Sequence, residues 1–135
     1  MISTAVDPSD SVNEPWRALV PGEVAVLNLL LATDFPGRSE LAAQARSALA
    51  RRVDQEGSLR FQADVPRAGV RVRVPVEGHY HDDGSAPGPH RPAVNLLLHV
   101  VDGRLHELEV YKDDGSVIRI QPFAVSLAEI EVFVN

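Results

Sequence analysis

The stretch AVNLLLHVVDGRLHELEVYKDDGSVI, residues 93–118, decides the fold. Two segments in it, residues 93–101 and 104–111, are rich in the β-branched, leucine and tyrosine side chains of a partly buried strand. Only Asp102 and Gly103 separate them, and an Asp-Gly pair between apolar segments is a strong signal for a tight hairpin turn. The sequence therefore predicts an antiparallel hairpin in which Val101 pairs with Arg104.

A second turn follows this hairpin at residues 113–115, where two aspartates precede a glycine. If these residues form a type I turn closed by a left-handed Gly115, residues 116–120 return as a third strand. The expected pairs are Lys112 with Ser116, Glu109 with Arg119, and Leu108 with Ile120. Opposite charges and apolar residues then face each other, which favours this register.

Upstream, SLRFQADV (residues 58–65) and VRVRVPVE (residues 70–77) alternate apolar and polar residues, as half-buried strands do. Joined through PRAG, they pair Asp64 with Arg71 and Phe61 with Val74. A slip of one residue would turn every apolar side chain to the wrong face. The sequence therefore predicts a second hairpin with this register.

Before the strands, apolar residues recur at helical spacing. In PGEVAVLNLLLA, residues 21–32, Glu23 occupies the first turn, and a common face is formed by Val24, Leu27, Leu30 and Leu31. RSELAAQARSALARRV, residues 38–53, is predicted as a second, amphipathic helix. Helices followed by a run of strands predict an α+β fold, with two N-terminal helices packed on an antiparallel meander sheet of five or six strands.

The two ends of the chain differ in character. Residues 1–14 mix small, acidic and proline residues without apolar periodicity, so we expect a disordered tail before a single domain at residues 15–135. AVSLAEIEVFVN, residues 124–135, alternates enough to form a final strand, and a helical turn at residues 126–130 is the alternative.

The bulk composition excludes several classes of protein. The 135 residues are 44% hydrophobic and 24% charged, as in ordinary single-domain globular proteins. No apolar segment approaches the ~18 residues of a membrane span and no signal peptide is visible, so we expect a soluble cytoplasmic protein. The absence of cysteine excludes disulfides and thiolate nucleophiles. The net charge of −6 argues against nucleic acid as a partner.

The hexapeptide YHDDGS, residues 80–85, recurs as YKDDGS, residues 111–116. Helix-loop-helix calcium sites place oxygen ligands at alternate positions and end on a glutamate, which neither copy does. We therefore interpret both copies as turns, in which aspartate carboxylates bond backbone amides and the glycine takes a positive φ angle.

All five histidines lie between residues 79 and 106. The first candidate site joins His79, His81, Asp82, Asp83 and His90, because imidazole and carboxylate groups together suit divalent metals. Their spacing matches no established zinc motif, and a solvated polar loop is the simpler interpretation. We therefore expect neither a resident metal nor a cofactor.

The second candidate site lies on the hairpin at residues 93–111. A two-residue turn places His99 directly opposite His106, with Glu107 and Glu109 on the other face. Paired histidines could serve acid-base chemistry, but no nucleophile or oxyanion donor accompanies them in the sequence. The simpler interpretation is that they are half-buried sheet residues bonded to their neighbours.

The segments RALVPGEVAVLNLLL, VRVPVEG and LLLHVVDGRLHELEVYKDDGSVI resemble a family of short uncharacterised bacterial proteins with an LHVxDGxLxELExYxxDG core. The resemblance covers most of residues 16–121 and implies a helix-then-sheet domain, but its hairpin motifs imply no activity. The loop SAPGPHRPA is longer than the family pattern, so a site there would not be inherited. A looser resemblance to immunity proteins of bacterial toxin systems rests on size, acidity and fold style.

Two hypotheses follow for the function. The leading one is a non-enzymatic binding or accessory protein whose partner is another protein, with an immunity-like role as one form of it. The alternative is a small histidine- or metal-dependent enzyme or ligand binder that uses residues 79–106. The sequence leaves the oligomeric state open.

Overall fold

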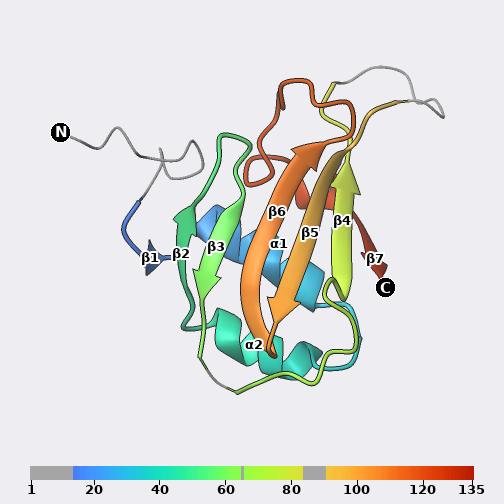
Figure 1. The fold of residues 1–135 in the computed structure, drawn as a ribbon. Helices are drawn as coiled ribbons and strands as arrows, with labels where there is room; N and C mark the ends of the chain where they lie inside the picture. The colour runs from blue at the N-terminus through green and yellow to red at the C-terminus, as the bar shows by residue number, and fades with distance from the viewer. Residues whose placement is uncertain (1–13, 65, 84–90) are drawn as a thin grey trace.

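The computed structural model describes residues 14–64, 66–83 and 91–135 of the chain. Within them, two helices pack on one face of a seven-stranded antiparallel sheet with the order β1-β2-β3-β6-β5-β4-β7 (Figure 1). The helices are α1 (Pro21–Leu31) and α2 (Arg38–Ala45), and the strands are β1 (Arg17–Ala18), β2 (Leu49–Arg52), β3 (Leu59–Gln62), β4 (Val76–Tyr80), β5 (Val94–Val101), β6 (Arg104–Lys112) and β7 (Glu131–Val134). The predicted α+β fold is confirmed, with more strands than the five or six expected. No helix in these described ranges has the length and apolar character needed to cross a bilayer.

The predicted tail lies outside the described residues except for Glu14. Its carboxylate accepts a hydrogen bond from the backbone N–H of Arg52 on β2, at 3.1 Å. Trp16 follows, with the guanidinium of Arg51 lying 4.7 Å from its ring centroid in a cation–π contact. The chain from Glu14 onward is therefore attached to the edge of the sheet.

Helix α1 begins where the sequence predicts, because residues of its first turn meet the hydrogen-bonding needs of the backbone at the helix start. Pro21 occupies the first turn, where its missing N–H costs nothing. The carboxylate of Glu23 accepts the N–H of Val20 at 2.9 Å and pairs with Arg17 at 2.8 Å. The buried face consists of Val26, Leu27, Leu30 and Leu31. Val24, which was predicted on this face, is 39% exposed.

The second helix is shorter than predicted. Helix α2 ends at Ala45, and the last part of the expected 38–53 helix is strand β2, which pairs with β3 and β1. Near the end of α2, Gln44 is 1% exposed, accepts the N–H of Leu105 at 2.8 Å and donates to the carbonyl of Gly103 at 2.8 Å. The Gln44 amide therefore connects α2 to the β5–β6 turn. The helical pattern of the sequence did not predict this contact.

The predicted hairpin of residues 58–65 and 70–77 is wrong. Strand β3 lies between β2 and β6, so that Phe61 faces Ala50 rather than Val74. The described residues between β3 and β4, 63–64 and 66–75, form no strand, and β4 pairs with β5 and β7 (Figure 1). The expected pairing of Asp64 with Arg71 is therefore absent.

The β5–β6 hairpin is confirmed, including its turn. Asp102 and Gly103 have φ angles of 53° and 72°, the left-handed pair that a type I′ turn requires, and Val101 pairs with Arg104. The inward residues of this hairpin form the centre of the core, with Leu96, Leu98, Leu105 and Leu108 at 2% exposure or less. These two strands place the polar groups of the opposite face.

The turn after β6 is also confirmed, but the strand expected after it is not. Gly115 has a φ angle of 74°, and its N–H bonds the carbonyl of Lys112 at 2.9 Å. Residues 116–120 form no strand, and the expected partners of Arg119 and Ile120 pair elsewhere, with Glu109 opposite Leu97 and Leu108 opposite Leu98. At the C-terminal end a short 3-10 helix, η2 (Leu127–Glu129), precedes β7, so both alternatives for this segment are present.

Candidate functional site

The face of the sheet opposite the helices carries most of the predicted site residues. In Figure 1 this face is turned toward the viewer, and both helices lie behind it. The strand pairings place two rows of side chains across it. The first row is Glu131, His79, Asn95 and Tyr111, and the second is Phe133, Glu77, Leu97 and Glu109. We call these eight residues the acidic patch.

A continuous chain of hydrogen bonds crosses the acidic patch. Asn95 donates to the carboxylate of Asp113 at 2.7 Å, and its side-chain carbonyl lies 2.6 Å from Nδ1 of His79. Nε2 of His79 lies 2.7 Å from Glu77, whose other oxygen accepts the side-chain N–H of Asn135 at 2.8 Å. The chain of contacts therefore joins β6, β5, β4 and the end of β7.

The donor and acceptor pattern determines the orientation of the Asn95 amide. The amide nitrogen of Asn95 faces only acceptors, the carbonyls of Ala93 and Tyr111 and the carboxylate of Asp113, so its oxygen must face His79. Both ring nitrogens of His79 consequently face oxygen atoms, the side-chain carbonyl of Asn95 and the carboxylate of Glu77. The imidazole therefore bridges β5 and β4 within the acidic patch.

Tyr111 and Phe133 supply exposed aromatic surface between these carboxylates. Tyr111 is 40% exposed and Phe133 is 48% exposed, and the Phe133 ring meets the His79 ring edge-on at 5.3 Å. Burial, followed by the negative charges of Asp113, Glu109 and Glu77, raises the pKa of Tyr111. The two rows contain no lysine or arginine, so this aromatic surface lies in a negative field.

The predicted pairing of His99 with His106 is wrong, because β6 carries a bulge beside these residues. The ladder shifts between His99 and Val100, so His99 faces Glu107. Nε2 of His99 bonds Glu109 at 2.8 Å, and Nδ1 accepts the Nε–H of Arg73 at 3.0 Å. His99 and the two glutamates therefore share one face, and both nitrogens of His99 are engaged within the protein.

His106 lies apart from this network. It lines a hollow of 460 Å³ beside Phe61, where β3 and β6 separate. Its ring nitrogens have no hydrogen-bond partner among the described residues. Burial, followed by the positive charge of Arg60, lowers the pKa of His106. The neutral imidazole is therefore favoured.

The lowered pKa predicts a pH dependence of stability. His106 is protonated more readily in the unfolded chain than in the folded chain. Its contribution to the free energy of unfolding is therefore fully present above the ordinary pKa of 6.5. This contribution is lost as the pH falls through the lower pKa that His106 has in the folded protein. Urea unfolding of the wild type and His106→Asn between pH 7.5 and 5 should show a smaller loss of unfolding free energy in the variant. Parallel losses in both proteins would contradict the assignment.

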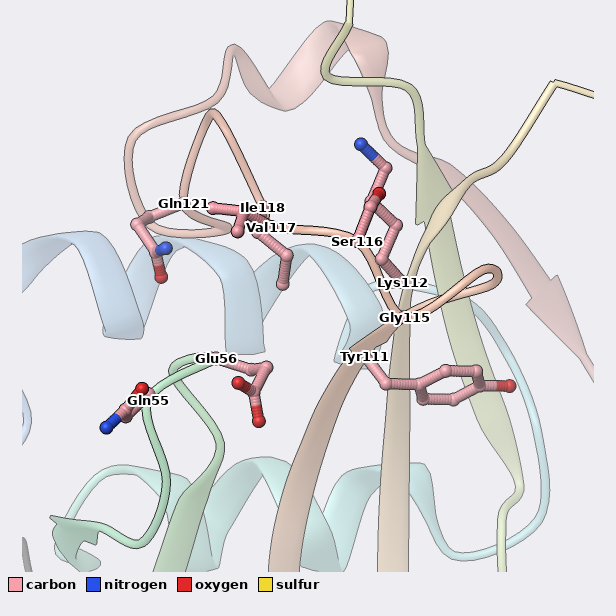
Figure 2. A pocket seen from close by; sticks show the side chains of 9 residues that line it. All are labelled: Gln55, Glu56, Tyr111, Lys112, Gly115, Ser116, Val117, Ile118 and Gln121. Atoms are coloured by element: carbon pink, nitrogen blue, oxygen red, sulfur yellow. The ribbon is translucent and has the colours of Figure 1, made fainter.

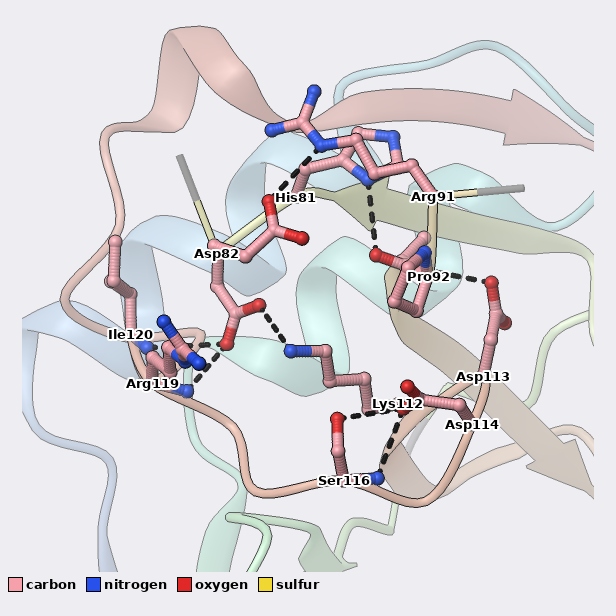
Figure 3. A network of polar contacts seen from close by, with 12 residues as sticks. His81, Asp82, Arg91, Pro92, Lys112, Asp113, Asp114, Ser116, Arg119 and Ile120 are labelled. Atoms are coloured by element: carbon pink, nitrogen blue, oxygen red, sulfur yellow. Dashed lines mark hydrogen bonds and ion pairs between the residues drawn. The ribbon is translucent and has the colours of Figure 1, made fainter. Parts of the chain in front are cut away.

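Asp82 is a structural residue rather than a member of an open metal site (Figure 3). Its side chain is fully buried, and it pairs at 2.8 Å with the ammonium of Lys112, whose side chain is 4% exposed. The other carboxylate oxygen accepts the backbone N–H groups of Arg119 and Ile120. Burial alone would raise the pKa of Asp82, but the hydrogen bonds from Lys112 and these amides outweigh it and hold the pKa below its ordinary value.

The two copies of the acidic hexapeptide therefore differ. In the second copy, Asp113, the counterpart of Asp82, accepts the N–H of Ala93 at 2.9 Å, and Asp114 accepts the N–H of Ser116 at 3.0 Å, as expected for a turn. In the first copy, Asp82 bonds the distant segment after β6 and the lysine of the second copy. The two copies therefore have different structural roles despite their similar sequences. Gly84, which was expected to take a positive φ angle in the first copy, lies outside the described residues.

The remaining members of the first candidate site lie around the end of β4. Asp83 pairs with Arg91 at 3.0 Å. Nδ1 of His81 lies 3.1 Å from the carbonyl oxygen of Pro92 (Figure 3). His90 lies outside the described residues. Across the ranges that the structure describes, no three His, Asp or Glu side chains are grouped closely enough to hold a metal.

A separate hollow of 380 Å³ opens beside the turn after β6 (Figure 2). The side chains of Gln55 and Glu56 approach it from below in this view, whereas the Tyr111 ring points to the opposite side, away from them. None of the nine predicted site residues lines it. The hollow is therefore distinct from the sites that the sequence indicated.

Sequence reasoning identified His79, His99 and Glu109 but missed six residues that surround them: Glu77, Asn95, Leu97, Tyr111, Glu131 and Phe133. Their alternation along the strands at residues 93–101 and 104–111 could have placed Asn95, Leu97 and Tyr111 on one face. Glu77 and Phe133 could not be placed there, because the pairing of β4 and β7 is not visible in the local pattern.

The comparisons with known proteins bear on the family alone. No curated protein and no solved structure is detectably similar to the chain. A family model described as a domain of unknown function, DUF6984, matches residues 16–122. This match includes both helices and every strand through β6, which is most of the 135 residues. The chain therefore belongs to the DUF6984 family of domains of unknown function.

Proposed function

We propose that the protein is a non-enzymatic binding protein that docks a basic surface of another protein on its acidic patch. The observation that supports this most strongly is the position of the exposed Tyr111 among carboxylates on a sheet face without a helix over it. Tyrosine and arginine are enriched at the centres of protein interfaces. An arginine of the partner would stack on the Tyr111 ring and pair with Glu109.

The bonding of the histidines favours binding over catalysis. His79 and His99 each use both ring nitrogens in contacts within the sheet, so proton transfer to a substrate would break these contacts. The network instead holds the carboxylates of Glu77 and Glu109 in fixed positions. A rigid arrangement of charges lowers the entropy cost of binding a complementary surface.

The immunity-like role is a particular case of this proposal, in which the basic partner is a toxic protein and binding takes place in the cytoplasm. The small size and the net charge of −6 support it. Coexpression with a toxin encoded beside the gene should restore growth, and Tyr111→Ala should abolish the rescue.

A quantitative capture experiment tests the proposal. The partner should bind wild-type protein, bind Glu131→Lys and Tyr111→Ala at least about tenfold more weakly, and bind Glu129→Lys normally. Glu129 is a matched control, because it is exposed, lies two positions away and belongs to η2 rather than to the patch. The captured protein, once purified, should be basic and bind less tightly at higher salt. Equal capture by all four proteins would contradict the proposal.

A ligand-binding role for the 79–106 region is a second candidate, supported by one observation. His106 offers a neutral, unbonded imidazole to a hollow that also contains Gln62 and Arg104. Chemical-shift changes of the His106 ring on addition of small carboxylic acids, absent in His106→Asn, would support it. No change at millimolar concentration would contradict it.

A further inference from the structure

Within the part of the chain that the structure describes, strand β7 leaves one edge of the sheet open. It pairs with β4 on one side and is the last strand in the sheet order. Two of its apolar residues are exposed, Phe133 at 48% and Val134 at 42%. An exposed edge with apolar side chains is a template for another strand.

The hydrogen-bond alternation shows which backbone groups of β7 are free. The N–H of Asn135 bonds the carbonyl of Pro75 at 3.0 Å, so this pair belongs to the hydrogen-bonded positions of the β4–β7 ladder. Because these positions alternate in antiparallel strands, Phe133 and Glu131 also bond toward β4. The N–H and C=O groups of Val132 and Val134 therefore point away from the sheet.

These free groups are complementary to those of a second β7. When two copies meet antiparallel about a twofold axis at Phe133, Val132 of each copy lies opposite Val134 of the other. Both valines present free groups, so each such pair exchanges two hydrogen bonds, four in all. Valine also meets valine on the helix side, and phenylalanine meets phenylalanine on the other face.

The charges agree with this register. Glu131 of each copy lies opposite Asn135 of the other, so the two carboxylates do not face each other. A shift that centres the axis on Val132 would instead place Glu131 opposite Phe133, and a shift to Glu131 would set like charges in contact. In the register about Phe133, each phenylalanine faces a phenylalanine and each valine faces a valine.

We propose that two copies of this chain associate through β7 in this register and form one continuous antiparallel sheet. The interface is isologous, as expected for a twofold dimer. Because each strand has four residues, association is weak and concentration-dependent. This inference does not rest on a partner at the acidic patch. The dimer engages the two patch residues on β7, Glu131 and Phe133, and leaves Tyr111 and Glu109 uncovered on β6.

Cysteine trapping tests the register, because the chain contains no cysteine of its own. In Phe133→Cys the two sulfurs lie across the axis at a non-hydrogen-bonded pair, where the Cα atoms are about 4.5 Å apart, within disulfide range. We expect a covalent dimer under mild oxidation. In the matched control Glu131→Cys, the two cysteines are separated by four residues along the strand, about 13 Å, and should remain unlinked.

Sedimentation of cysteine-free protein tests the association itself. Wild type and Val134→Ala should dimerise between about 10 µM and 1 mM, whereas Val134→Pro, which lacks the donor on the free edge, should stay monomeric. Its thermal midpoint should remain close to that of Val134→Ala, because the β4 ladder is intact. A monomeric wild type at the highest concentration would overturn the proposal. Dimerisation of Val134→Pro, or equal trapping of both cysteine variants, would also overturn it.

Discussion

Lys112→Met is expected to lower the free energy of unfolding by about 3 to 5 kcal/mol, because it leaves a buried carboxylate without its cation. The side chain of Asp82 has no exposed surface, and Lys112 is its partner at 2.8 Å. Urea unfolding at pH 7 measures the change. A loss below about 1 kcal/mol, the usual value of an exposed ion pair, would contradict the buried pair.

The double variant Asp82→Asn with Lys112→Met provides the control. It removes both charges but keeps a side-chain oxygen for the N–H of Arg119, so it should unfold at a higher urea concentration than Lys112→Met alone. If the double variant loses the sum of the two single losses, the two residues do not interact.

Phe61→Ala should cost about 3 to 5 kcal/mol, the usual range for removal of a buried aromatic ring. Phe61 is 6% exposed and belongs to the main apolar cluster, facing Ala50 across the β2–β3 ladder. Thermal and urea unfolding measure the loss. Val117→Ala, at a position that is 83% exposed, should leave stability unchanged. An unchanged midpoint in Phe61→Ala would contradict the placement of β3.

The successes of the sequence analysis were local. The Asp102-Gly103 turn requires left-handed backbone angles that aspartate and glycine tolerate, so two residues determined the β5–β6 hairpin. Glu23 likewise placed the first turn of α1. Where the determining interactions lie within a few residues of each other, the sequence contains the answer.

The failures concern long-range pairing. The alternation at residues 58–65 and 70–77 is compatible with a hairpin, but alternation specifies which face is buried and not which strand is the neighbour. Strand β3 pairs instead with the preceding strand β2 and with β6, whose paired residues lie more than 40 positions away in the sequence. The segment at residues 49–52 was also misassigned, since it becomes a strand through its pairing with β3 on one side and with the distant β1 on the other.

The prediction of the candidate site was wrong in two places: at the bulge in β6 and at the buried ion pair of Asp82 with Lys112. The hydrophobic pattern does not reveal the extra residue in β6. Because of this residue, His99 lies opposite Glu107 instead of His106, and it bonds Glu109. Asp82 was indistinguishable from its neighbour Asp83 in sequence, but one is buried against Lys112 and the other pairs with Arg91. Charge pairs between distant segments require the fold to be known first.

Photo-crosslinking tests the central claim, that the acidic patch docks a basic protein, most directly. A photoreactive phenylalanine analogue is placed at position 111 and the protein is expressed in cells of the organism that encodes it. Irradiation should give one defined adduct with a basic protein, and Glu131→Lys should reduce the yield of this adduct at least about tenfold. The same analogue at Val24, which is exposed on α1 behind the sheet, should not give this adduct. The same adduct from both positions, or an adduct that Glu131→Lys leaves unchanged, would contradict the account.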